Sequence, residues 1–198
     1  MKEVIIATNN AHKVDEIRTA LSFEGWDYRT LKEAGIESSP EETGTTFLDN
    51  ARIKARAVYR MTGKAVLADD SGLVVDILGG APGVYSSRYC GIDGDDEKNN
   101  ERLLRELDGV PLEKRQARFM CVLVFIDENG NETVAEGTIE GRIGFEERGS
   151  GGFGYDPLFL VQAFDYSRAL AEVSQEEKNS ISHRGNALRE LRKKLFVG

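Results

Sequence analysis

The sequence predicts an α/β fold built on a mixed β-sheet. Short runs of apolar, β-forming residues occur between amphipathic segments with helical spacing, which indicates both element types in one chain. Strands and helices do not alternate strictly, because an Asn129-Gly130 turn joins two strand-like segments directly. The chain has 198 residues and no Pro/Ser-rich linker. We therefore predict a single domain over residues 1–198.

The N-terminal third begins with a predicted strand at residues 4–7. A helix follows, capped by Asn10 and stopped by Gly25, with an apolar face formed by Val14, Ile17 and Leu21. A second helix is predicted from residues 45–46 to Gly63, and its buried stripe is Phe47, Ala51, Ala55 and Val58. A short strand at 65–68 then runs into the polar sequence at 69–72.

The remaining elements are predicted in the same way. A Gly/Pro loop at 79–83 precedes a charged helix over 95–107, and strands at 119–126 and 132–139 flank the Asn129-Gly130 turn. Seven glycines fall between positions 137 and 154, ahead of a strand at 158–161. Helical spacing of Ala187, Leu188, Leu191 and Leu195 predicts the C-terminal helix.

Composition excludes several classes of protein. Lys and Arg number 26 against 34 Asp and Glu, a formal charge of −8, which disfavours a nucleic-acid coat or a binder of anionic membranes. The two cysteines lack metal-ligand spacing and are too few for a disulfide scaffold. With no signal-peptide pattern and no apolar run of about 18 residues, we expect a cytoplasmic protein without a membrane segment.

The first polar motif is Thr8-Asn9-Asn10, followed by Lys13. A strand that ends in small polar residues before a helix directs backbone N–H groups and the positive end of the helix dipole at one place. This arrangement suits a phosphate, with Lys13 in the first helical turn. An ordinary capped turn explains the same residues.

Two acidic pairs form the second motif, Glu41-Glu42 and Asp69-Asp70. Mg²⁺ takes one or two carboxylates and completes its shell with water and substrate phosphates. Consecutive strand residues point to opposite faces, so we do not expect Asp69 and Asp70 to face one site together. Each pair alone is also typical of an ordinary turn.

The other two motifs lie toward the C-terminus. In the glycine-rich segment 149–157, Phe153 and Tyr155 could stack on a base and Asp156 could bind its edge; alternatively the segment is a hairpin loop with an aromatic ring in the core. Farther along, Lys178 suits a phosphate, and His183-Arg184 suit a carbonyl oxygen, unless this is only a solvated helix start capped by Ser182. No nucleophile–base set can be assembled, which disfavours covalent catalysis.

These motifs occur in a fixed order together with three further features, Glu16, the segment Thr43-Gly44-x-x-Phe47-x-x-Asn50-Ala51, and Gly79-Gly80-Ala81-Pro82-Gly83. In this order the sequence closely resembles the inosine triphosphate pyrophosphatase family from about Ile5 to Leu195. The resemblance implies an elongated central mixed sheet flanked by helices, in two lobes with an active-site cleft between them. It also implies a homodimer and Mg²⁺-dependent hydrolysis of ITP, dITP and XTP to the monophosphate and pyrophosphate. Such an enzyme removes deaminated purines from the nucleotide pool.

Residue roles follow from the same resemblance. Glu41 and Asp70 would hold the metal, and Asp70 would also be the base for the attacking water. The substrate-binding residues it implies are Thr8, Asn9, Asn10, Lys13 and Lys54 for the triphosphate, Ser71 as a further contact, Phe153, Gly154, Tyr155 and Asp156 for the base, and Lys178, His183 and Arg184 to complete the pocket.

Two other functions remain open from the sequence. One is a Maf-type pyrophosphatase of other modified or pyrimidine nucleotides, but the 153–156 loop and the Ser182-His183-Arg184 segment argue against it. A non-catalytic nucleotide sensor would need no base. The sequence leaves open the preferred substrate, the means of rejecting GTP, the dimer surface, and whether Glu42 or Asp69 reaches the metal. We expect free nucleotides as partners, and neither DNA, RNA nor a membrane.

Overall fold

The computed structural model describes residues 2–20 and 23–196. Its six-stranded sheet has the order β2-β1-β3-β4-β5-β6. β1 pairs in parallel with both β2 and β3, whereas β5 and β6 are antiparallel. The strands are β1 (Lys2–Ile6), β2 (Trp26–Thr30), β3 (Ala65–Val75), β4 (Gln116–Ile126), β5 (Glu132–Ile143) and β6 (Phe159–Val161). The predicted α/β fold with a mixed sheet is therefore confirmed.

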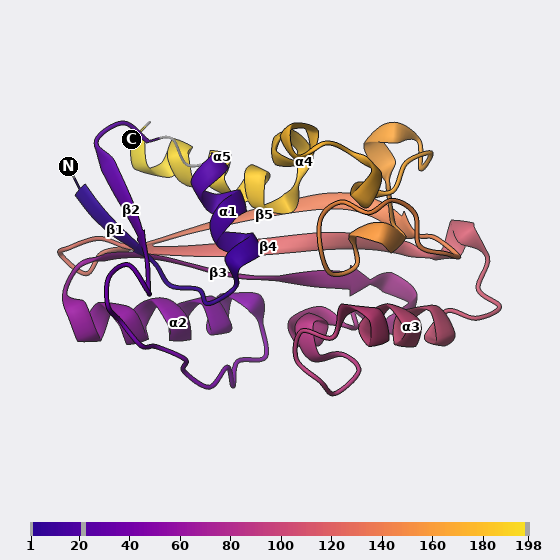
Figure 1. Cartoon of the computed structure of the whole chain (residues 1–198), viewed down its shortest axis with the longest axis horizontal. Helices are drawn as coiled ribbons and strands as arrows, with labels where there is room; N and C mark the ends of the chain where they lie inside the picture. The colour runs from indigo at the N-terminus through magenta and orange to yellow at the C-terminus, as the bar shows by residue number, and fades with distance from the viewer. Residues whose placement is uncertain (1, 21–22, 197–198) are drawn as a thin grey trace. The chain divides into compact units, whose positions relative to one another are not determined.

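Helices flank this sheet (Figure 1). The α-helices are α1 (Ala11–Ala20), α2 (Phe47–Thr62), α3 (Asp96–Glu106), α4 (Gln175–Ile181) and α5 (His183–Phe196). Short 3₁₀ turns lie at η1 (Asp76–Leu78), η2 (Gly83–Arg88), η3 (Leu112–Lys114), η4 (Asp156–Leu158), η5 (Gln162–Phe164) and η6 (Leu170–Glu172). No helix among the described residues is long and apolar enough to cross a membrane.

Local sequence signals account for the helix ends. The Thr46 side chain caps α2 by accepting a hydrogen bond from the Asp49 amide, and Gly63 ends the helix with φ of 64°. Asp95 caps α3 in the same way, accepting from the Lys98 amide. The inward position expected for Leu21 lies outside the described residues.

The chain separates into two compact units. Unit 1 comprises residues 1–71, 121–137 and 183–198, and unit 2 comprises 72–120 and 138–182. Strands β3, β4 and β5 contribute residues to both units. The single domain over 1–198 stays a prediction.

In unit 1, alternate residues of β3 pack on different helices. Ala65 and Leu67 belong to a core formed with Val14 and Ile17 of α1 and Leu188 of α5. Their neighbours in sequence, Val66 and Ala68, belong to a second core with Ala51, Ala55 and Val58 of α2. Figure 1 shows α1 and α5 on one face of this part of the sheet and α2 on the other. The alternation is the period-two pattern of a strand buried on both faces.

Unit 2 has its own core. Leu103 and Leu107 from the α3 segment pack with Leu73 and Val75 of β3 and with Phe159 of β6. Leu103 and Leu107 are both fully buried, and Leu104 is partly buried against the same core.

Three features differ from the sequence-based prediction. β2 and α4 were not predicted, because each is short and has few apolar residues. The strand predicted at 65–68 continues to Val75, so the Asp69-Asp70-Ser71 segment lies within β3 and is not a turn at its end. The strand was predicted to end before Asp69 because polar residues follow. Cations from neighbouring helices allow these carboxylates to be buried in the strand.

Candidate active site

Asp69 and Asp70 occupy consecutive positions in β3, and both are buried. Because side chains alternate along a strand, Asp69 continues the face of Ala65 and Leu67, and Asp70 continues the face of Val66 and Ala68. The two carboxylates therefore lie on different faces of the strand, as expected from the sequence.

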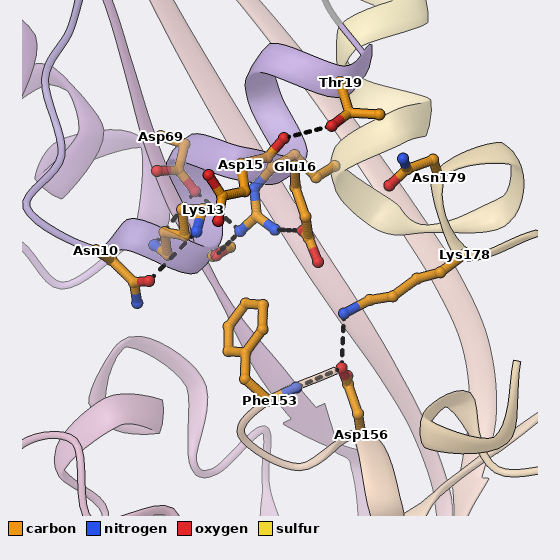
Figure 2. A network of polar contacts seen from close by, with 12 residues as sticks. Asn10, Lys13, Asp15, Glu16, Thr19, Asp69, Phe153, Asp156, Lys178 and Asn179 are labelled. Carbon is orange, nitrogen blue, oxygen red and sulfur yellow. Dashed lines mark hydrogen bonds and ion pairs between the residues drawn. The ribbon is translucent and has the colours of Figure 1, made fainter. Parts of the chain in front are cut away.

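Asp69 faces cations from α1 and α5. Its Oδ2 lies 3.2 Å from Nζ of Lys13 (Figure 2). The same oxygen lies 3.1 Å from Nη2 of Arg184. Burial alone would raise the pKa of Asp69, but Lys13 and Arg184 outweigh it and hold the pKa well below its ordinary value. At neutral pH Asp69 is thus an anion between two cations.

Arg184 has two further partners in unit 1. It forms an ion pair with Glu16 of α1, and its Nη2 donates to Ser71 Oγ at 2.9 Å. Only 1% of Arg184 is exposed, so these acids surround its guanidinium in the interior. Glu16, Asp69, Arg184 and Lys13 form one buried network, called here the α1–α5 network.

Asp70 faces α2. Its Oδ1 accepts a hydrogen bond from Lys54 Nζ at 3.2 Å, and the same ammonium lies 3.3 Å from Oε1 of Glu42. Burial raises the pKa of Asp70, and the opposing effect of Lys54 and Lys13 does not cancel that rise. For Lys54, burial lowers the pKa, but the surrounding carboxylates outweigh it and the net shift is upward. Asp70 is therefore the more basic of the two aspartates.

The Asp70 carboxylate fits a hard cation such as Mg²⁺. Its Oδ2 is buried and accepts no hydrogen bond from the described residues, although Oδ1 is held by Lys54. No group of three or more Asp, Glu, His or Cys side chains suited to a metal occurs within residues 2–20 and 23–196. Two carboxylates with phosphate oxygens and water suffice for Mg²⁺. Lys54 contacts both Glu42 and Asp70, which brings these two carboxylates to the same ammonium group. Glu41, the expected metal ligand, is exposed.

The 8–10 segment connects β1 to α1 and has the geometry of a helix cap. Asn10 Oδ1 accepts from the Lys13 amide at 3.3 Å, and Thr8 Oγ1 accepts from the Asn10 amide at 3.2 Å. Asn9 Nδ2 donates to the Ser38 carbonyl at 3.0 Å. The cap turns the chain so that Lys13 faces Asp69, and phosphate binding by the three polar side chains stays a prediction.

His183 and Arg184 begin α5, and both are buried. α5 approaches β5 closely at Gly137, where a Cβ would lie 2.3 Å from the Ala187 amide nitrogen and from the His183 carbonyl oxygen. Glycine is required there because any side chain would collide with the helix backbone. This close packing is what brings Arg184 to Asp69.

In unit 2, Asp156 organises the glycine-rich loop. Its Oδ2 accepts from the Phe153 amide at 3.0 Å and from Nζ of Lys178 at 2.6 Å (Figure 2). Lys178 Nζ also lies 4.7 Å from the centroid of the Phe153 ring, a cation–π distance. A Cβ at Gly152 would come within 2.0 Å of Asp156 Oδ2, so the turn must be glycine. Phe153, Asp156 and Lys178 are thus brought together, and we call them the Phe153 cluster.

Tyr155 has a different environment from Phe153. Its ring belongs to the core of unit 2, and its hydroxyl donates to the Ser86 carbonyl at 2.7 Å. Burial raises the pKa of the Tyr155 phenol far above its ordinary value. Phe153 is only half-buried. Of the two rings expected to stack on a base, Phe153 is the one that the structure leaves partly accessible.

Three acidic residues take part in these contacts without having been assigned a role from the sequence: Glu16, Glu42 and Asp69. Glu16 had a usable signal, since it lies between Val14 and Ile17 on the face of α1 that is buried. A carboxylate on such a face needs a buried cation, but the sequence alone does not identify Arg184 as that partner, 168 positions away.

Comparison of the sequence with known proteins identifies its family. Residues 4–194 match the model of the Ham1 family. The chain belongs to the Ham1 family. Its relatives include the dITP/XTP pyrophosphatase of Bacillus licheniformis, 51% identical over 96% of both chains. The dITP/XTP pyrophosphatase of Bacillus subtilis is 50% identical over 98% of both.

The structures of this family agree with the fold. The structure of a HAM1 protein from Coxiella burnetii superimposes with a TM-score of 0.89 at 40% identity, and the match covers 100% of both chains. The fold described here is therefore that of a Ham1 protein over its full length.

Proposed function

We propose that this chain is a Mg²⁺-dependent enzyme that hydrolyses ITP, dITP and XTP to the monophosphate and pyrophosphate. The coarser part of this statement, a nucleoside triphosphate pyrophosphatase of the dITP/XTP type, is confirmed by relatives that are about half identical over nearly the whole chain. The Mg²⁺ requirement, the use of ITP and the removal of deaminated purines from the nucleotide pool belong to the proposal.

One observation carries the chemistry, the environment of Asp70. A buried carboxylate with a raised pKa, held at one oxygen by Lys54, has its other oxygen available for a proton or a cation. Asp70 lies beside cations, and the sequence motifs contain no nucleophile–base set. This arrangement suits direct attack of water on the substrate, with the carboxylate as general base.

The residues of unit 1 would divide the work as follows. Asp70 orients the attacking water and accepts its proton, and Lys54 and Lys13 bring positive charge to the triphosphate oxygens. Asp69 and Glu16 hold Lys13 and Arg184 in place before substrate arrives, so little reorganisation is needed. A Mg²⁺ ion held by Asp70 and a glutamate, Glu41 or Glu42, would neutralise phosphate charge and polarise the bond to be broken.

The Phe153 cluster of unit 2 is proposed to bind the purine. The Phe153 ring offers a stacking surface, and Asp156 with Lys178 supplies an acceptor and a donor beside it. Hypoxanthine and xanthine carry a 6-oxo group, an acceptor for the ammonium of Lys178. Adenine presents an amino group at that position, so its nucleotides should be poor substrates.

The proposal includes a homodimer that works in the cytoplasm on free nucleotides. The net charge of −8 disfavours long polyanions such as DNA and RNA. Light scattering during gel filtration measures the mass in solution, and a mass of one chain would contradict the dimer.

The experiment is a product assay. The protein is incubated separately with XTP, dITP, ITP, ATP and GTP, with and without Mg²⁺, and pyrophosphate and orthophosphate are measured. We expect pyrophosphate from the first three, no turnover after chelation of Mg²⁺, and slow reaction with ATP and GTP. Orthophosphate as the direct product, or equal rates on ATP and ITP, would contradict the proposal. Binding without turnover indicates the sensor, and faster turnover of modified pyrimidine nucleotides indicates a Maf-type activity.

A further inference from the structure

The glycine-rich loop next to Phe153 is held by α3, an element that no sequence motif connects with the substrate. Oδ2 of Asp96 accepts a hydrogen bond from the Gly154 amide at 2.8 Å. Nδ2 of Asn100 donates to the Gly154 carbonyl at 3.2 Å. Both polar groups of one residue are therefore bound by side chains from a single helix.

Asp96 and Asn100 are four positions apart, so they lie on the same face of α3 one turn from each other. Gly154 has φ of 62°, a left-handed conformation that favours glycine. Asn100 is buried and donates also to Oε1 of Glu147 at 2.9 Å. The helix thus contacts the loop at Gly154 and at the segment before it.

The rest of the loop is constrained on its other side by Asp156. That carboxylate accepts from the Phe153 amide, and Gly152 fits against it without room for a Cβ. Phe153 therefore lies between two anchored positions, the turn fixed by Asp156 and the Gly154 peptide fixed by α3. Its backbone has little freedom while both anchors are in place.

We infer that Asp96 and Asn100 are positioning residues that set Phe153 for the purine of the substrate. The inference rests on the proposed function, in which Phe153 stacks on the base. A ring held in place before binding loses less conformational entropy when the base arrives, which lowers KM. The residues of unit 1 that are proposed to bind phosphate take no part in the contacts of Asp96 and Asn100 with Gly154.

The fold of α3 does not depend on Asp96. Leu103 and Leu107 anchor this helical segment in the core of unit 2, and Asp95 supplies the N-cap. Asp96 is exposed. Removal of its carboxylate should therefore free the loop while the helix stays folded.

The test compares Asp96→Ala with Asp96→Asn, which keeps an acceptor oxygen, and with Glu97→Ala. Glu97 is an exposed carboxylate in the same first turn, so its variant loses the same charge from the helix start. Steady-state kinetics with XTP are measured beside inhibition by inorganic tripolyphosphate, which has phosphates and no base. Melting temperatures show that each variant is folded.

For Asp96→Ala we expect KM for XTP to rise about five- to tenfold, because one exposed charge-assisted hydrogen bond is lost. The kcat and the inhibition constant of tripolyphosphate should not change. Asp96→Asn should recover most of the affinity, and Glu97→Ala should equal the wild type. Asn100→Asp should raise KM for XTP, as Asp96→Ala does, because the new carboxylate repels the Gly154 carbonyl.

An unchanged KM in Asp96→Ala, or an equal weakening of tripolyphosphate, would overturn the inference while leaving the proposed function intact. A wild-type protein that releases no pyrophosphate from XTP would instead refute the proposed function. Equal effects of Glu97→Ala and Asp96→Ala would show that helix charge, and not the Gly154 contact, is responsible.

Discussion

Asp69 and Asp70 are adjacent in sequence, yet their carboxylates bind cations that come from opposite faces of the sheet. Asp69 pairs with Lys13 of α1 and Arg184 of α5, and Asp70 pairs with Lys54 of α2. The pKa of Asp69 is lowered and that of Asp70 is raised. One buried strand thus carries a fixed anion and a more basic carboxylate side by side, suited to two different tasks.

The first prediction concerns Asp70. Asp70→Asn removes the base while keeping shape, so kcat with XTP should fall by about 10²–10⁴. Since burial disfavours the charged carboxylate, the melting temperature should not fall. Single-turnover kinetics and thermal unfolding measure both quantities, with Asp76→Asn, an exposed carboxylate paired with Arg118, as the control. A loss of kcat smaller than tenfold would rule out the assigned role.

The second prediction concerns Asp69. Asp69→Asn leaves the buried Arg184 and the partly buried Lys13 with less negative charge. Breaking a buried ion pair in this way costs about 3–5 kcal/mol of unfolding free energy. Urea unfolding at neutral pH measures the change. If Asp69→Asn and Asp70→Asn were equally stable, the two carboxylates would not have the separate roles assigned to them.

The pH dependence of stability gives a third prediction. Because the pKa of Asp69 is lower in the folded than in the unfolded state, its contribution is complete above the unfolded value and is lost as pH falls below about 4. The unfolding free energy of the wild type should decrease over that range. The decrease should be shallower in Asp69→Asn, and parallel curves for the two proteins would contradict the lowered pKa.

The fourth prediction concerns the contact between β5 and α5. Gly137→Ala places a Cβ against backbone atoms of His183 and Ala187 at 2.3 Å, so α5 must move and stability should fall by about 2–4 kcal/mol. Gly144→Ala is the matched control, since its Cβ would lie 3.5 Å from the Leu160 side chain. Similar urea midpoints for the two variants would mean that a Cβ at position 137 does not destabilise the contact between β5 and α5.

The two cysteines give a fifth prediction. Cys121 is fully buried in the core of unit 1, and burial raises its pKa to about 12, so its thiol stays protonated and protected. Cys90 is half-buried. Alkylation of the native protein, followed by mass spectrometry, should label Cys90 and not Cys121. Rapid labelling of Cys121 without unfolding would contradict the packing described around β4.

Sequence patterns predicted most of this fold, because its long helices have regular apolar stripes and recognisable caps, such as Thr46 and Gly63 for α2. β2 and α4 escaped prediction, since a strand of five residues and a helix of seven have little periodic signal. The length of β3 was underestimated at Asp69, where burial depends on cations brought in by α1, α2 and α5.

For the candidate site, the sequence proposed side chains but not the pairs that they form. It predicted that Asp69 and Asp70 would face different ways, and the structure confirms this. The contact between Glu16 and Arg184, and those of Asp96 and Asn100 with Gly154, depend on tertiary packing of distant segments. No spacing rule along the chain reports such contacts.

We propose that water, with Asp70 as its base, attacks the α-phosphorus of a deaminated purine triphosphate. Hydrolysis of dITP in water enriched in oxygen-18, followed by mass spectrometry of both products, tests which phosphorus is attacked. We expect the heavy oxygen in the monophosphate and none in the pyrophosphate. Label in the pyrophosphate would place the attack at the β-phosphorus and contradict it.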